Sequence, residues 1–132
     1  MLEEIEISTN ERVCFVDITG RIKKLIQQAK VKEGICTVYV PHTTAGITVN
    51  EGADPSVVRD ILTILDKIVP QIASYTHLEG NSPAHIKSTL VGCSKTLIVH
   101  NGEIQLGTWQ KVFFCEFDGP RRRSFYVKII NS

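Results

Sequence analysis

The sequence has almost no excess of charge of either sign. Its 15 Lys and Arg residues against 14 Asp and Glu residues leave a formal net charge of +1. Proteins that bind nucleic acid or anionic membranes through a broad basic surface carry a clear excess of cations. The longest apolar runs, such as Val112–Cys115, are also far shorter than the roughly 20 residues that cross a bilayer. We therefore expect neither a nucleic-acid partner nor a membrane.

Several motifs of catalysis and metal binding are missing as well. The chain has no GxxxxGK[ST] or GxGxxG phosphate-binding loop and no GxSxG nucleophile elbow. No two of its four cysteines form a CxxC pair, and each lies among apolar neighbours, so we interpret them as small core side chains. These residues are Cys14, Cys36, Cys93 and Cys115.

The composition that remains is that of an ordinary soluble domain, with 42% hydrophobic and 22% charged residues. A chain of 132 residues buries roughly two-thirds of the surface that it exposes when unfolded, which is enough for one core without disulfides. Residues 1–132 are therefore expected to form a single compact domain. The segment Met1–Glu6 opens with acidic residues and lacks the basic and apolar regions of a signal peptide, so we expect a cytoplasmic protein.

Strand-like and helix-like patterns alternate along the chain. Ile5–Ile7 and Val13–Val16 predict an opening pair of strands joined by a polar turn. Helical spacing of apolar residues from Thr19, after Asp54-Pro55 and after Ser82-Pro83 predicts three helices. Further strands are predicted at 35–40, 47–49, 96–99, 103–118 and 125–130, with a hairpin turn at 101–102 and a reversal at 118–120. These elements indicate an α+β domain built on a mainly antiparallel, sandwich-like β-sheet.

One acidic residue occupies a strand position where apolar residues surround it. Alternation puts Glu116 on the same face as Phe114, so its carboxylate must find a cation or hydrogen-bond donors, or its pKa rises. Arg121 and Arg123 share one face of the following strand and are the cations closest in sequence. Two interpretations stay open, a structural acid paired with one of these arginines and a functional acid in a site.

Three of the four histidines lie near the ends of predicted elements. His42 follows a buried strand, His77 lies in the polar segment before the third helix, and His85 lies in the first turn of that helix. A folded loop would bring His77, Asn81 and His85 together, whereas His100 fits an exposed position in the hairpin. Spacing alone does not define a metal site, because His77 and His85 lack the i, i+4 spacing of two ligands on one helix.

The start of the third helix offers a second kind of binding. Free N–H groups at Ser82 and the positive end of the helix dipole favour an anion such as phosphate. Candidate neighbours are Thr43, Thr44, Lys87 and the run Arg121–Arg123. Because many helix ends bind only water and arginine runs are often solvated, both interpretations stay open.

Four ordered blocks of residues resemble the YjbQ family. They are His42–Glu51, Gly80–His85, Leu106–Gln110 and Glu116–Arg123, and the resemblance covers nearly the whole chain. Members of this family are described as secondary thiamine-phosphate synthase enzymes. The resemblance implies a sheet-rich α+β fold, assembly as a homotrimer, and a site drawn from these blocks.

The resemblance also implies roles for individual residues. It points to His42, His77 and His85 as ligands of a divalent metal ion, Mg²⁺ or Zn²⁺. Catalytic roles are expected for His85, Glu116 and Glu51. Beside Thr43, Thr44 and Ser82, the positions that match the blocks and would line the pocket are Asn50, Glu51, Asn81, Trp109, Gln110, Glu116 and Arg121.

We therefore expect an enzyme that joins a pyrimidine diphosphate to a thiazole phosphate and releases pyrophosphate. In this scheme His85 and His42 hold the metal or the pyrophosphate, Arg121 pairs with phosphate oxygens, and one of the two glutamates orients a ring amine. Trp109 stacks on a heteroaromatic ring. Two alternatives keep the same pocket: a metal-dependent hydrolase or transferase acting on another small phosphorylated molecule, and a trimeric protein that binds a metal or phosphorylated ligand without turnover.

Overall fold

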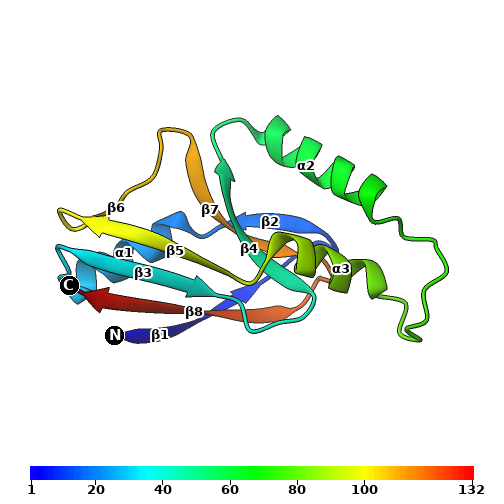
Figure 1. Cartoon of the computed structure of the whole chain (residues 1–132), viewed down its shortest axis with the longest axis horizontal. Coiled ribbons are helices and arrows are strands. Elements are labelled where there is room, and N and C mark those ends of the chain that lie inside the picture. The colour runs from blue at the N-terminus through cyan, green and yellow to red at the C-terminus, as the bar shows by residue number, and fades with distance from the viewer.

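The computed structural model describes residues 1–132 as eight strands and three helices (Figure 1). The strands are β1 Leu2–Ser8, β2 Cys14–Asp17, β3 Gly34–Tyr39, β4 Ala45–Glu51, β5 Ser94–His100, β6 Glu103–Ile104, β7 Gln110–Glu116 and β8 Arg122–Asn131. The helices are α1 Thr19–Ala29, α2 Pro55–Ile68 and α3 Ser82–Val91. The larger sheet has the order β1-β8-β3-β5-β6 and the smaller sheet the order β2-β7-β4, with antiparallel pairing throughout. The predicted α+β domain with mainly antiparallel sheets is confirmed.

The main core joins the two sheets and α1 in one cluster of 18 buried residues. It includes Val38 from β3, Phe114 from β7 and Ile22 from α1. Ile22 and Ile26 lie one helical turn apart on the buried face of α1, while Lys23 is exposed, as the amphipathic pattern predicts. The alternation of buried and exposed residues along β8 fits a sheet with one covered face.

The predicted pairing of the first two strands is wrong. β1 pairs with β8 and β2 pairs with β7, so the two strands belong to different sheets. The segment between them is held by distant residues: Thr9 N–H donates to the Arg121 carbonyl at 3.0 Å, and Gly119 N–H donates to the Arg12 carbonyl at 2.9 Å. These long-range partners decide the pairing, and local strand propensity does not contain them.

The Asn101-Gly102 hairpin is confirmed. Both residues have positive φ, 52° and 76°, as this tight turn requires, and they join β5 to β6. The predicted return strand over 103–118 is instead two strands, because the chain leaves the larger sheet after Ile104 and joins the smaller sheet at Gln110. The reversal at 118–120 likewise carries the chain from the smaller to the larger sheet, so β7 and β8 do not pair.

The four cysteines are free thiols. Cys36 and Cys115 are buried as predicted, and burial raises the pKa of the Cys36 thiol to about 11. Cys14 is half-buried. The core interpretation is wrong for Cys93, which is exposed between α3 and β5.

Helix α2 lies along the edge of the molecule, apart from the main core (Figure 1). None of its residues is buried. Val58 and Leu65 pack against a small second cluster around Phe113, whereas Ile64 and Ile68 are 49% and 63% exposed. No helix of the protein is both long enough and apolar enough to span a membrane.

Helix α3 packs closely on β4, and this contact positions the residues at the start of α3. Ile47 N–H donates to the Gly92 carbonyl at 3.0 Å, and Ser88 Oγ donates to the Ala45 carbonyl at 2.6 Å. A Cβ added at Gly46 would lie only 2.7 Å from the Gly92 carbonyl oxygen. The absence of a side chain at Gly46 therefore allows the end of α3 to approach β4 this closely.

We expect Gly46→Ala to lower the free energy of unfolding by about 1–3 kcal/mol, because the added methyl group pushes α3 away from β4. Gly20→Ala is the matched control, since a Cβ at Gly20 in α1 meets nothing within 4 Å. Alanine is favoured over glycine in helices by roughly 0.5–1 kcal/mol, so this control should keep or gain stability. Urea unfolding measures both variants, and an undiminished stability of Gly46→Ala would contradict the close packing.

Candidate functional site

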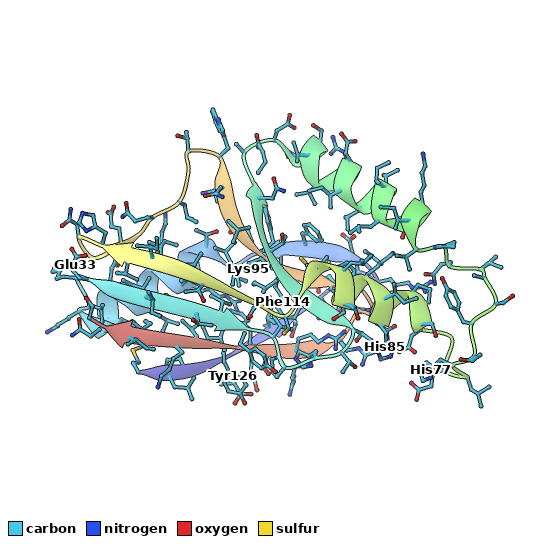
Figure 2. The ribbon with its side chains drawn as sticks, in the orientation of Figure 1. Glu33, His77, His85, Lys95, Phe114 and Tyr126 are labelled. Atoms are coloured by element: carbon cyan, nitrogen blue, oxygen red, sulfur yellow. The ribbon has the colours of Figure 1, made fainter.

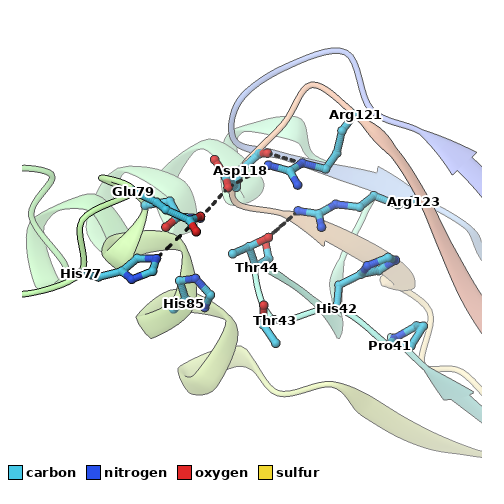
Figure 3. A pocket seen from close by; sticks show the side chains of 11 residues that line it. Pro41, His42, Thr43, Thr44, His77, Glu79, His85, Asp118, Arg121 and Arg123 are labelled. Carbon is cyan, nitrogen blue, oxygen red and sulfur yellow. Dashed lines mark hydrogen bonds and ion pairs between the residues drawn. The ribbon is translucent and has the colours of Figure 1, made fainter.

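A polar cleft of about 730 Å³ lies where α3, the segment before it and the ends of several strands meet (Figure 3). This volume is in the range of small-molecule sites in proteins. Apart from Pro41, every lining residue has a polar side chain. The lining includes three histidines and two arginines: His42, His77, His85, Arg121 and Arg123.

The structure brings His77, Asn81 and His85 together in this cleft, as predicted for a folded loop before the third helix. His77 and His85 lie at one end of the molecule (Figure 2), with ring centroids 5.4 Å apart and ring planes at 90°. His77 Nε2 lies 3.8 Å from Glu79 Oε2 (Figure 3). His85 is fixed on the first turn of α3, and His77 reaches it from the irregular segment before that helix.

The fourth histidine lies at the opposite end of the molecule. His100 Nδ1 is 2.9 Å from the Glu33 carboxylate, and both side chains are about half exposed. Figure 2 shows Glu33 far from His77 and His85. The hydrogen bond from His100 lowers the pKa of Glu33. The prediction of an exposed hairpin residue is confirmed for His100.

His42 has a distinct environment within the cleft. Burial, together with the positive charge of Arg123, lowers the pKa of His42, so its imidazole is neutral at pH 7. Its Nε2 lies 3.0 Å from both the backbone N and the carbonyl O of Ser124. In either tautomer the Ser124 backbone therefore holds Nε2, and only Nδ1 is left for a ligand.

A buried ion pair holds the wall of the cleft. Glu116 is fully buried and accepts hydrogen bonds from Arg123 Nε at 2.9 Å and Nη2 at 2.5 Å. The carboxylate also accepts from Thr9 Oγ1 at 2.7 Å and from Asp118 N–H at 3.0 Å. Arg123 Nη2 donates in addition to Thr44 Oγ1 at 2.7 Å (Figure 3).

These contacts favour the structural interpretation of Glu116. Both carboxylate oxygens have donors, and the residue is 0% exposed, so a substrate cannot reach it. Burial alone would raise the pKa of Glu116, but the hydrogen bonds from Arg123, Asp118 and Thr9 bring it below its usual value. Glu116 therefore stays charged and orients Arg123, a positioning role in place of the catalytic role expected from the sequence.

The second arginine is held more loosely. Arg121 donates from Nε to the Asp118 carbonyl at 2.8 Å and from Nη2 to Asp118 Oδ2 at 2.9 Å, with its side chain 48% exposed. Neither Arg121 Nη1 nor Arg123 Nη1 donates to another protein group. Each arginine therefore keeps donors that can meet the oxygens of a phosphate.

The side chain of Asn81 has a buried hydrogen-bond acceptor that no donor of the protein contacts. Its Nδ2 donates to Asp118 Oδ2 at 2.9 Å, and because an ionised carboxylate only accepts, this bond fixes the orientation of the amide. Asn81 Oδ1 is then buried without any hydrogen-bond partner. An unpaired buried acceptor costs about 1–3 kcal/mol, so Oδ1 is a natural contact for a donor group on a bound molecule.

The predicted three-histidine metal site does not have a ready set of ligands. No group of three or more His, Cys, Asp or Glu side chains converges closely enough to hold a metal ion. His42 Nε2 is also already held by the Ser124 backbone. The three histidines therefore do not fit a ready centre for the divalent ion, and binding of Mg²⁺ or Zn²⁺ stays a prediction.

The other predicted residues divide between the cleft and its surroundings. Thr43 and Thr44 line the cleft, as does Asn81. Ser82 does not, because it lies in an adjoining pocket that also contains His77 and His85. The structure therefore places Ser82 beside the cleft, whereas the helix-terminus prediction expects it in the pocket.

A further group of predicted site residues lies at the far end of the smaller sheet. Asn50 and Glu51 end β4, and Glu51 pairs with Gln110 at the start of β7. Trp109 precedes Gln110 and is 61% exposed. β4 extends about 20 Å, so its two ends cannot share one small cleft. Within one chain, Asn50, Glu51, Trp109 and Gln110 do not line the cleft.

The structure excludes one predicted phosphate-binding residue and shows two lining residues of the cleft that were not predicted. Lys87 is buried and paired with Asp66 of α2, so it is not free to bind phosphate. Glu79 and Asp118 line the cleft but were not among the predicted site residues. Asp118 shares the strand face of Glu116, two positions on, which is a usable signal, whereas nothing in the sequence pattern distinguishes Glu79.

The fold and the cleft together define a small α+β protein in which two antiparallel sheets present a cleft rich in histidine and arginine. The family model described as UPF0047 protein YjbQ-like matches residues 3–132. The chain therefore belongs to the YjbQ family, and the resemblance seen in the sequence is confirmed.

Relatives and solved structures agree with this assignment. A UPF0047 protein of Methanocaldococcus jannaschii is 61% identical over 130 residues, covering 98% of this chain and 94% of that protein. UPF0047 protein YugU of Bacillus subtilis is 46% identical over 131 residues, covering 98% and 99%. An uncharacterized YjbQ/UPF0047 family protein from Clostridium acetobutylicum, solved by crystallography, superposes with a TM-score of 0.95 at 52% identity, covering 97% of this chain and 99% of that chain. A YbjQ-like protein of unknown function from Sulfolobus solfataricus gives a TM-score of 0.96 at 32% identity, covering 100% and 97%.

We expect a strong coupling between Glu116 and Arg123 in a double-mutant cycle. Glu116→Leu or Arg123→Met alone should cost roughly 3–5 kcal/mol of stability, because each leaves a buried charge without its partner. The double variant should lose clearly less than the sum of the two. Urea unfolding of the four proteins measures the coupling, and additive losses would exclude a direct interaction.

The pH dependence of the stability of the same four proteins is the control for this cycle. Because the folded pKa of Glu116 lies below its unfolded value near 4.3, its stabilising contribution is present above that pH and is lost as the pH falls through the folded pKa. The wild type should therefore lose stability more steeply below about pH 4 than the double variant.

Proposed function

We propose that the cleft is an active site at which a small phosphorylated molecule loses a phosphate or pyrophosphate group, with thiamine phosphate formation as the reaction. The observation that carries the proposal is the convergence of two arginines with free donors and the paired imidazoles of His77 and His85 in a cleft with no large apolar side chain. The proposed reaction joins a pyrimidine diphosphate to a thiazole phosphate and releases pyrophosphate.

The arginines suit the charge that develops on a departing pyrophosphate. Arg123 is aligned by Glu116 and Thr44 before any ligand arrives, so it needs little reorganisation during the reaction. Arg121 is half exposed and keeps Nη1 free, which lets it meet an incoming phosphate. The two guanidinium groups thus supply a fixed and an adjustable contact for phosphate oxygens.

His85 is the group that we propose moves a proton. His85 lies in the first turns of α3, and its ring forms a T-shaped pair with that of His77. Imidazole is the commonest general acid and base in enzymes, and here it lines the same cleft as Arg121 and Arg123. His85 would hold the proton that the leaving oxygen takes up, while Asn81 Oδ1 accepts a donor group of the substrate.

A second candidate function keeps this site and changes the substrate. No Trp, Phe or Tyr lines the cleft, and Trp109 lies at the far end of β7, so one chain offers no aromatic platform there for two heteroaromatic rings. This lining favours a hydrolase or transferase acting on another small phosphorylated molecule. A binding protein without turnover is the remaining alternative, and the assay below distinguishes it.

We also propose that the chain assembles as a homotrimer in the cytoplasm. The apolar residues Ile64 and Ile68 of α2 are 49% and 63% exposed within the chain. Ile35, Ile98 and Ile130 are neighbours on the exposed face of the larger sheet, 39%, 62% and 49% exposed. Two different uncovered surfaces on one chain suit a head-to-tail ring. The four free cysteines suit a reducing compartment.

The first test is thiamine phosphate formation from both purified precursors with Mg²⁺, using protein from a host that lacks its own synthase. We expect Arg121→Ala to lower turnover roughly 100-fold or more and His85→Ala to abolish it, because these side chains meet the leaving group. Arg122→Ala is the matched control, since Arg122 is exposed and does not line the cleft. Circular dichroism should show all variants folded.

Each outcome separates the candidates. Full activity of His85→Ala would refute the assignment of the site. If folded wild type forms no thiamine phosphate but hydrolyses simple phosphoesters, the second candidate is correct. Tight calorimetric binding of pyrophosphate with no turnover of any substrate would identify a binding protein.

For the assembly, we expect light scattering of the wild type at micromolar concentration to give about three times the chain mass of 14.7 kDa. Ile64→Glu should shift the protein to smaller species, because it buries a charge in the proposed interface. Thr63→Glu, an exposed neighbour on the same helix, should keep the trimer. A monomeric wild type would rule out the proposed assembly.

A further inference from the structure

A second pocket of about 410 Å³ adjoins the cleft, and we call it the side pocket. It shares His77 and His85 with the cleft, so the two cavities meet at this pair of rings. The rest of its lining comes from the segment before α3 and from the first turns of α3: Ser74, Tyr75, Thr76, Ser82 and Ile86.

The side pocket has the apolar surface that the cleft lacks. Ile86 and the ring of Tyr75 line it, and no Arg, Lys, Asp or Glu does. The cleft contains the opposite set, with Arg121, Arg123 and two acidic residues and no aromatic hydrocarbon ring. Charged groups therefore favour the cleft, and an uncharged ring favours the side pocket, because burial of an unpaired charge is costly.

The polar groups of the side pocket are uncharged. Tyr75 uses its hydroxyl to donate to the Pro70 carbonyl at 2.5 Å, which leaves its ring as a wall. The hydroxyls of Ser74, Thr76 and Ser82 can donate or accept at the edge of a ring. A flat ring with polar atoms at its rim suits this mixture better than a plain hydrocarbon chain.

We infer that the substrate is a phosphate or diphosphate ester of an uncharged ring compound, which spans both cavities at once. Its phosphate lies in the cleft against Arg121 and Arg123, its ring lies in the side pocket against Tyr75 and Ile86, and the bond between them passes the His77–His85 pair. This inference rests on the proposed function for the phosphate end and adds the site of the ring. It places His85 beside the ester oxygen, where a general acid is needed.

Calorimetry with methyl phosphate and benzyl phosphate tests the inference, because the two probes share the charged group and differ in the ring. We expect benzyl phosphate to bind the wild type roughly tenfold more tightly or better, since its ring loses contact with water. Ile86→Trp fills the side pocket and should remove this advantage without changing the affinity for methyl phosphate. Leu90→Trp is the matched control one turn along α3, because Leu90 is 58% exposed and lines neither cavity.

The outcomes distinguish the inference from the function on which it rests. Equal affinities of the wild type for the two probes, or an advantage that persists in Ile86→Trp, would overturn the side pocket as the ring site and leave the proposed function standing. Failure of both probes to bind the wild type would overturn the proposed function itself and the inference with it. If the tighter binding of benzyl phosphate is lost in Ile86→Trp and kept in Leu90→Trp, the result supports both the side pocket as the ring site and the proposed function.

Discussion

The carboxylate of Glu116 and the guanidinium of Arg123 meet where the two sheets are joined. Glu116 ends β7 in the smaller sheet and Arg123 lies at the start of β8 in the larger one, while Thr9 after β1 and Thr44 before β4 complete the network. Such a network is stable only when every buried group has a partner. Arg123 and Thr44 also line the cleft. The interaction that joins the sheets therefore also fixes the wall against which a phosphate is proposed to bind.

Helix caps and tight turns could be predicted from the sequence, because their signals lie within a few neighbouring residues. Strand pairings that depend on residues far apart in the chain could not. Asp54 accepts from Ser56 N–H at 2.9 Å and caps α2 as its Asp-Pro sequence indicates, and the Asn101-Gly102 turn joins β5 to β6. Both signals act within a few residues. The choice of β8 as the partner of β1 depends on residues more than 100 positions away, so no local pattern contains it. The same limit explains why the return strand divides between two sheets.

The candidate site shows the same division. The sequence places His42, His77 and His85 near the ends of strands and helices, where sites are often built, and the fold brings these ends together. Glu51 and Trp109 were expected in the pocket because they belong to blocks of sequence that resemble the family. A block that contains a whole strand has ends about 20 Å apart, so its residues need not share a site within one chain. The structural interpretation of Glu116 rests on its burial, and burial cannot be read from strand alternation alone.

The segment between α2 and α3 connects α2, on which Ile64 and Ile68 are exposed, to both cavities. Between residues 71 and 80 its backbone makes a single internal hydrogen bond, from Tyr75 N–H to the Ala73 carbonyl at 2.9 Å, and Ile72 and Leu78 are 93% and 99% exposed. A ligand that contacts His77 must therefore remove conformational freedom from this segment, at a cost in entropy. Any partner that holds α2 removes part of that freedom beforehand. In the proposed trimer, ligand affinity and self-association would then be linked by mass action, and the affinity of the cleft would depend on protein concentration.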